Sequence, residues 1–73
     1  FNTNHNNIAI LLNNRATALH MLAASGFNVN ENLLNALKDA EKALEFDREY
    51  IKVSFELMLV LVALYTHYCC QQS

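Results

Sequence analysis

The chain has 73 residues and a mass of 8.3 kDa, which leaves room for one small domain or a piece of one. Hydrophobic residues make up 53% of it and charged residues 16%, too apolar a mixture for a disordered tail, while one glycine and no proline argue against a turn-rich β-sandwich or barrel. Five Lys and Arg against seven Asp and Glu, with no basic run, argue against nucleic acid as a partner.

Residues 1–7 form a polar, asparagine-rich lead-in that we expect to be frayed. From Ile8 onward the apolar residues recur in steps of three and four, which is typical of one apolar stripe on a helix. The sequence therefore predicts a helix over about 6–24 that ends at a left-handed residue in Ser25-Gly26. The predicted stripe consists of Ile8, Leu11, Leu12, Leu19, Leu22 and Ala23.

Residues 25–30 are expected to connect this helix to the next one, with Asn28 or Asn30 as its cap and Glu31 at a capping-box spacing from Asn28. The second predicted helix is strongly amphipathic. Its apolar face carries Leu33, Leu37, Ala40 and Leu44, with Ala36 and Ala43 beside them. Its solvated side is expected to carry Lys38, Asp39, Glu41, Lys42 and Glu45.

Asp47 is suited to cap a third helix, which is expected over about 48–68. The centre of this helix is a run of nine apolar residues, Leu57–Tyr65, with no polar face. A helix that is apolar all round is either buried on all sides or lies in a membrane. A membrane span needs about 20 mostly apolar residues, and Lys52 and Glu56 interrupt the run on its N-terminal side. A membrane anchor is therefore the less favoured alternative.

The favoured interpretation is a helix that packs on the second helix on one side and on a further neighbour on the other. If half of Leu57–Tyr65 faced water, the unrealised burial would be on the order of 5–10 kcal/mol, comparable to the whole stability of a small domain. Such a patch seldom stays bare. The neighbour is expected to be another repeat or a second copy, the latter by self-association through Leu57–Tyr65.

Two stretches resemble the helices of a tetratricopeptide repeat. Residues 13–22 read NNRATALHML, similar to the first helix of such a repeat, and residues 36–47 read ALKDAEKALEFD, similar to the second. Residues 50–53 look like the opening of a following repeat, so the resemblance covers about residues 9–56. It implies an all-α fold: an antiparallel helix-turn-helix repeat of the α-solenoid type plus a third stacking helix. Because one repeat cannot bury both of its faces, such units occur in stacks.

The chain departs from the repeat pattern at several points. The stretch from Ala23 to Ala36 is longer than the pattern needs, which we interpret as an insertion at about 24–32 that lengthens both helix ends or bulges as a loop. Arg48 stands where the repeat closes with proline, and Met58 stands where the family often has Gly or Ala. The expected organisation is a lead-in at 1–7, a helix pair at 8–47, and a third helix with a short tail at 48–73.

Some tetratricopeptide domains clamp the C-terminal carboxylates of large heat-shock chaperones with an Asn, a Lys and an Arg. Asn14 and Lys52 match the Asn and the Lys, and they are the candidate peptide-binding residues that the resemblance implies. Glu56 stands at the Arg position, which reverses one charge of the site. The alternative is that Asn14 is an ordinary surface residue and that Lys52 pairs weakly with Glu56 or Glu49.

The remaining chemistry-bearing residues form no recognisable site. His5, His20 and His67 are scattered, and a metal site from His67, Cys69 and Cys70 would need a fourth ligand, so we expect neither a metal nor another cofactor. The adjacent cysteines close no useful loop, which favours free thiols, a reducing compartment and a cytoplasmic location. The chain has neither an initiator methionine nor a signal-peptide layout, and it is expected to be a segment of a longer protein.

No catalytic constellation or phosphate-binding loop is recognisable, so an enzyme is not expected. The sequence predicts a non-catalytic protein-protein interaction module, a scaffold or a co-chaperone-like domain. Such a module would bind a peptide or a partner helix in the groove between the first and third helices, with the acidic C-terminal tail of a chaperone as one candidate. The alternatives are a structural, self-associating repeat fragment or a C-terminal membrane-associated helix.

Overall fold

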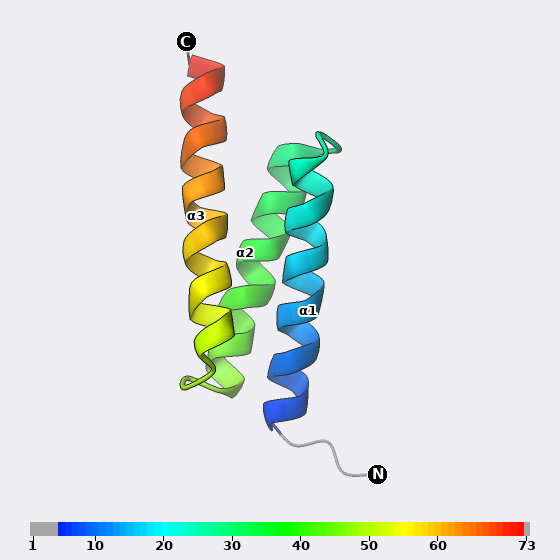
Figure 1. Cartoon of the computed structure of the whole chain (residues 1–73), viewed down its shortest axis with the longest axis vertical. Helices are drawn as coiled ribbons and strands as arrows, with labels where there is room; N and C mark the ends of the chain where they lie inside the picture. The colour runs from blue at the N-terminus through cyan, green and yellow to red at the C-terminus, as the bar shows by residue number, and fades with distance from the viewer. Residues whose placement is uncertain (1–4, 73) are drawn as a thin grey trace.

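The computed structural model describes the backbone of residues 5–72 and the side chains of residues 7–69. It contains three helices, α1 (His5–Ala24), α2 (Val29–Phe46) and α3 (Ile51–Gln72), and no strand within the described backbone. The helix α2 runs antiparallel to α1 and α3, so α1 and α3 point the same way (Figure 1). The prediction of an all-α chain with a helix pair and a third helix is confirmed. Residues 5–7 of the predicted lead-in begin α1 instead, and the rest of the lead-in lies outside the described residues.

The C-terminus of α1 is closed by a Schellman motif at the predicted place. The N–H of Phe27 donates to the carbonyl of Leu22 at 3.2 Å, and the N–H of Gly26 donates to the carbonyl of Ala23 at 2.9 Å. The motif needs a residue with positive φ directly after the helix, and Gly26 supplies it with a φ of +94°. A glycine in this turn therefore decides where α1 ends.

The N-terminus of α2 differs from the predicted capping box. Asn28 is the cap residue, with φ at 42°, but its side chain makes no capping hydrogen bond. The buried side chain of Asn32 instead donates from Nδ2 to the carbonyl of Phe27 at 2.8 Å and ties the first turn of α2 to the connection. The connection is only residues 25–28, so residues 24–32 do not bulge as a long loop, and most of them belong to the helix ends.

Asp47 ends α2 and organises the approach to α3. Its backbone is extended, and its carboxylate Oδ1 accepts the N–H of Glu49 at 3.1 Å. The N–H of Tyr50 donates to the carbonyl of Asp47 at 3.3 Å, which turns the chain before α3 begins. The helix α3 accordingly starts at Ile51 rather than at 48, and it continues to Gln72 rather than 68.

Alanine dominates the contact between α1 and α2. Both helices place alanine at seven-residue intervals, so that one small side chain faces the partner every two turns. These residues have essentially no exposed surface, and they let the helix backbones approach closely. They are Ala9, Ala16 and Ala23 on α1 and Ala36 and Ala43 on α2. The larger leucines Leu12, Leu19, Leu37 and Leu44 pack at the margins of this contact, as predicted.

Part of the predicted stripe on α1 is wrong. Leu11 and Leu22 are 68% and 45% exposed, so they do not belong to the core. The heptad of Ala9, Ala16 and Ala23 defines the buried face, and Leu11 and Leu22 stand outside it. Asp39, predicted on the solvated side of α2, is buried with an exposed fraction of 7%.

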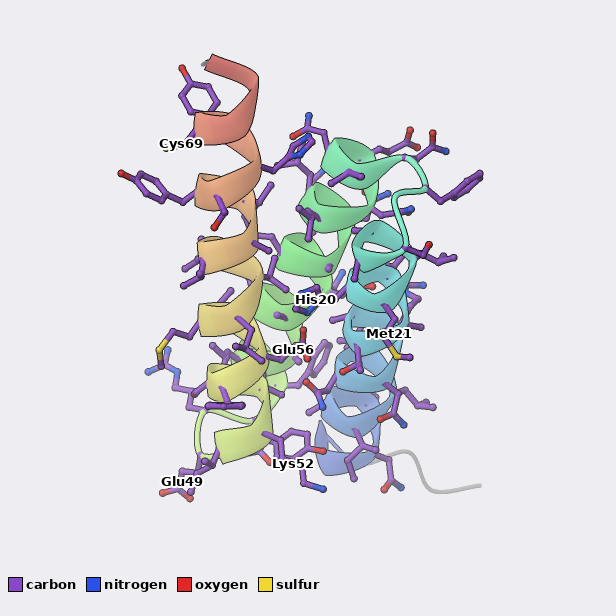
Figure 2. The ribbon with its side chains drawn as sticks, turned by 45° about the horizontal axis from the view of Figure 1, so that its top comes forward. His20, Met21, Glu49, Lys52, Glu56 and Cys69 are labelled. Carbon is purple, nitrogen blue, oxygen red and sulfur yellow. The ribbon has the colours of Figure 1, made fainter. Side chains whose placement is uncertain are left out.

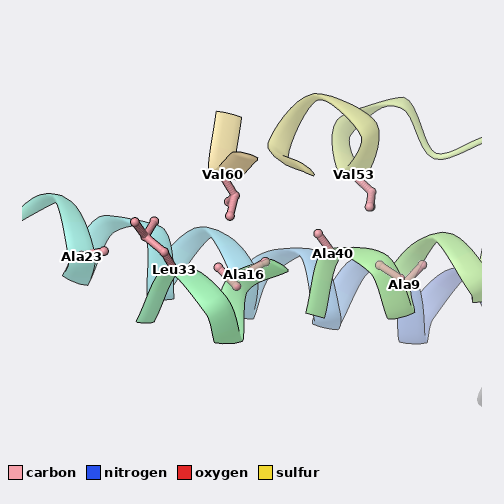
Figure 3. Packing of buried hydrophobic residues seen from close by; sticks show 9 residues of the cluster. Ala9, Ala16, Ala23, Leu33, Ala40, Val53 and Val60 are labelled. Carbon is pink, nitrogen blue, oxygen red and sulfur yellow. The ribbon is translucent and has the colours of Figure 1, made fainter. Parts of the chain in front are cut away.

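The helix α3 has one packed face and one open face. Val53 and Val60 are fully buried and point from α3 toward the layer formed by α1 and α2, with Ala40 opposite them (Figure 3). Most of the run Leu57–Tyr65 is exposed, since only Val60 in it is fully buried and Leu57, Ala63 and Leu64 are half-buried. The expectation that this helix packs on one side and stays uncovered on the other is matched within this chain.

By length and composition, the stretch Ile51–Cys69 could also cross a membrane, since it has 19 residues with a mean hydropathy of 1.3. This is longer than the nine-residue run that the sequence singles out. A single helix of this kind does not distinguish a membrane span from a packed helix of a soluble protein.

Candidate functional site

A buried carboxylate joins α1 to α3. The side chain of Glu56 has an exposed fraction of 11%, and both of its oxygens bond to α1. His20 Nδ1 lies 2.8 Å from Oε2, and because a carboxylate only accepts, this ring nitrogen carries the proton. Thr17 Oγ1 lies 3.1 Å from Oε1 and 2.9 Å from the carbonyl of Asn13. Figure 2 shows His20 and Glu56 facing each other between the two helices.

This geometry corrects the expectation for Glu56 and Lys52. The resemblance puts Glu56 at the Arg position of a peptide clamp, and the alternative interpretation pairs Lys52 with Glu56 or Glu49. The carboxylate of Glu56 turns into the molecule instead, and among the described side chains no ion pair joins Lys52 to Glu56 or Glu49. The carboxylate at the predicted Arg position is thus hydrogen-bonded to Thr17 and His20 of α1, and the side chain of Lys52 stays exposed.

Asn14 and Lys52, the two predicted binding residues, lie at the same level of the seam between α1 and α3. Asn14 is one turn before Thr17 on α1, and Lys52 is one turn before Glu56 on α3. Thr17 and Glu56 are in contact, and the two helices run in the same direction (Figure 1). Stepping back one turn along each helix therefore brings Asn14 and Lys52 to opposite sides of the same seam. Both residues are exposed.

Asn13, which precedes Asn14 on α1, has a buried side-chain oxygen without a hydrogen-bond partner. Its side chain is 7% exposed, and the oxygen is Oδ1. An unsatisfied buried polar atom costs about 1–3 kcal/mol. A donor that reached this oxygen would recover that free energy, which distinguishes Asn13 from the other buried side chains described above. Apart from its place in the asparagine pair of residues 13–14, no pattern in the sequence distinguishes this residue.

A cleft lies above the Glu56 cluster, toward the C-terminal ends of α1 and α3. Its volume is about 370 Å³, and residues from all three helices line it. Its wall is mostly apolar, from Ala23, Val29, Leu33 and Ala63, with the polar groups of His20, Thr66 and His67. The cleft is large enough for one apolar side chain, and His20 links it to the carboxylate of Glu56.

An ion pair joins α1 to α2 on the other side of α1. Arg15 Nε and Nη2 donate to the two carboxylate oxygens of Asp39 at 2.6 and 2.8 Å, a bidentate arrangement. The hydrogen bonds to Asp39, and then its negative charge, raise the pKa of Arg15. The arrangement explains why Asp39 is buried, since its carboxylate is satisfied by a guanidinium that itself remains largely exposed.

The structure brings together no metal site within the part that it describes. Among the side chains of residues 7–69, no three of His, Cys, Asp and Glu approach one another closely enough to hold an ion. Cys69 is exposed as a free thiol, and His67 lines the cleft. His5 and Cys70 lie outside the described side chains.

Comparison of the chain with protein-family models, with curated proteins and with solved structures found no match.

Proposed function

We propose that this chain is a non-catalytic protein-binding module of the tetratricopeptide type, in which the seam between α1 and α3 receives an extended peptide with an acidic end. The proposal extends to a scaffold or co-chaperone-like role in the cytoplasm, with an acidic C-terminal tail such as that of a chaperone as the ligand. Two observations support it: residues 13–22 and 36–47 resemble the helices of a tetratricopeptide repeat, and α1 and α3 run in the same direction.

One observation carries the proposal: Asn14 and Lys52 are exposed at the same level of the seam, while the nearest carboxylate, that of Glu56, is bonded to α1. An ammonium and an amide facing each other across a seam can both donate to one carboxylate. If Glu56 were free, it would occupy Lys52 and repel an anion. Its bonds to His20 and Thr17 remove that competition.

The experiment is a titration of a labelled short peptide that ends in acidic residues with a free C-terminal carboxylate. We expect saturable binding to the wild-type chain and about five- to tenfold weaker binding to Lys52→Ala, because one charge-assisted hydrogen bond is lost. The matched control is Lys42→Ala, which removes the same charge from an exposed position on α2.

An amidated copy of the peptide tests whether the terminal carboxylate is recognised, and it should bind as weakly as the free peptide binds Lys52→Ala. The proposal is wrong if no saturable binding is found. It is equally wrong if Lys52→Ala and Lys42→Ala weaken binding by the same amount, because the attraction would then depend on net charge alone.

A further inference from the structure

The outer face of α3 carries a regular apolar seam. Its residues recur in alternating steps of four and three, the spacing of the a and d positions in a coiled coil. They are Ile51, Phe55, Met58, Val62, Tyr65 and Cys69. All six are exposed. The exposed fractions of the five residues other than Cys69 range from 58% at Val62 to 81% at Ile51. Val53, Glu56 and Val60, which bury the opposite face, belong to none of these positions.

The exposed area matches what a stable pairing requires. The five large side chains of this face, each 58–81% exposed, present roughly 700 Å² of mostly apolar surface, and a standard protein interface buries about 800 Å² per partner.

We infer that a second copy of this chain covers this face, through an antiparallel pairing of α3 with α3 of the partner. No charged residue falls on the six seam positions. The two charged residues within α3 lie elsewhere, because Glu56 is buried against α1 and Lys52 lies one turn before it toward the seam between α1 and α3. The apolar surface is therefore self-complementary, as a two-fold interface must be.

The antiparallel direction follows from what each orientation brings together. An antiparallel pairing centred near residue 60 sets Met58 against the partner's Val62, Phe55 against the partner's Tyr65 and Ile51 against the partner's Cys69. It forms two aromatic pairs and opposes the helix dipoles favourably. A parallel pairing would set each aromatic residue against its own copy. It would also bring Lys52 at the start of α3, and Arg48 and Glu49 just before it, close to their own copies.

The first test is sedimentation of the wild-type chain and of Val62→Asp. We expect a dimer for the wild type and about a hundredfold or larger rise in the dimer Kd for Val62→Asp, because an unpaired carboxylate would be buried twice in the interface. The matched control is Leu34→Asp, which adds the same charge at an exposed apolar position of α2 outside this face. Circular dichroism must show unchanged helix in both variants.

The second test fixes the direction with thiols, in a Cys70→Ser background that leaves Cys69 as the only cysteine. The substitution Ile51→Cys in this background should give efficient disulfide-linked dimers on mild oxidation, since position 51 faces the partner's Cys69. The background alone should cross-link poorly. Equal cross-linking of the background would overturn the antiparallel direction.

Three outcomes would overturn the pairing itself. The first is a monomer at every concentration up to the millimolar range. The second is a dimer that Leu34→Asp weakens as much as Val62→Asp. The third is flotation of the wild-type chain with neutral phosphatidylcholine vesicles without dimerisation in buffer, which would assign this face to a membrane. The peptide titration with Lys52→Ala addresses a different face, so either proposal can fail without the other.

Discussion

The contact between α1 and α2 is closed by small side chains and an ion pair, whereas α3 is packed on one face only and leaves large apolar side chains in water on the other. The alanines at the contact between α1 and α2 expose essentially nothing, while Phe55, Val62 and Tyr65 of α3 are all more than half exposed. The comparison teaches that the facing surfaces of α1 and α2 are covered within this chain, whereas the outer face of α3 is left for an interface with something else.

The largest change in stability should come from a charge placed on the packed face of α3, compared with the same charge on its exposed face. Val60→Asp places a carboxylate at a fully buried position without a partner, and we expect it to lower the free energy of unfolding by about 3–5 kcal/mol, which would unfold so small a domain. Val62→Asp, two residues along on the exposed face, should keep the helical circular dichroism signal. Urea unfolding of both variants measures the difference, and equal destabilisation would contradict the assignment of the two faces.

The next largest loss of stability should come from a larger side chain at the alanine contact between α1 and α2. Ala36→Leu adds three carbons where the backbone of α1 approaches closely, and such overpacking costs about 1–3 kcal/mol of stability. Ala18→Leu makes the same change at an exposed position of α1, where the effect should stay within about 0.5 kcal/mol. Urea midpoints compare the two. An equal response would mean that the contact is not closely packed.

The carboxylate of Glu56 should contribute less to the free energy of unfolding than the alanine contact does, but more than an exposed carboxylate does. Glu56→Ala leaves the Nδ1–H of His20 without its acceptor and leaves Thr17 Oγ1 with the carbonyl of Asn13 alone, and we expect a loss of about 1–3 kcal/mol in the free energy of unfolding. Glu45→Ala removes an exposed carboxylate from α2 and serves as the control. Thermal unfolding should show a lower Tm for Glu56→Ala alone.

Glu56→Gln separates charge from shape at the same position. It keeps an acceptor for Thr17 and removes one negative charge near Lys52. If the seam binds an acidic peptide, this variant should bind it about two- to threefold more tightly, since less negative charge opposes the ligand. A peptide titration checks the change, and weaker binding by a folded Glu56→Gln variant would contradict the assigned role of Glu56.

The smallest effect is expected at Arg15. Arg15→Ala removes a bidentate partner from Asp39, but the arginine is 66% exposed and solvent screens the pair, so the Tm should fall less than for Glu56→Ala. Because the pKa of Arg15 is raised by Asp39, its contribution is present at every pH below its ordinary value and is lost only as the pH rises through the higher value in the folded state. Unfolding at pH 7 and pH 9 should therefore show the same difference between Arg15→Ala and the wild type.

The sequence was informative about periodic features and poor at polar contacts between helices. Periodicity predicted three helices, and Gly26 predicted where α1 stops, because each depends on residues close together in the chain. On α1 the periodic pattern favoured Leu11 and Leu22 and missed the buried Ala9. It misplaced Asp39, since an acidic residue on an amphipathic helix reads as solvated until the arginine opposite it is known. The candidate site divides in the same way. Asn14 and Lys52 were indicated by a resemblance, whereas the bonds of Glu56 depend on the register of α1 against α3, which joins residues as far apart in the chain as His20 and Glu56, 36 positions from each other.

The bonds of Glu56 have a consequence for the register of α3. Val53 and Val60 are buried by apolar contact, which is not directional and by itself leaves the position of α3 along its own axis weakly determined. The two hydrogen bonds of Glu56 to Thr17 and His20 oppose sliding along that axis, and they set the height at which every other residue of α3 meets the rest of the molecule.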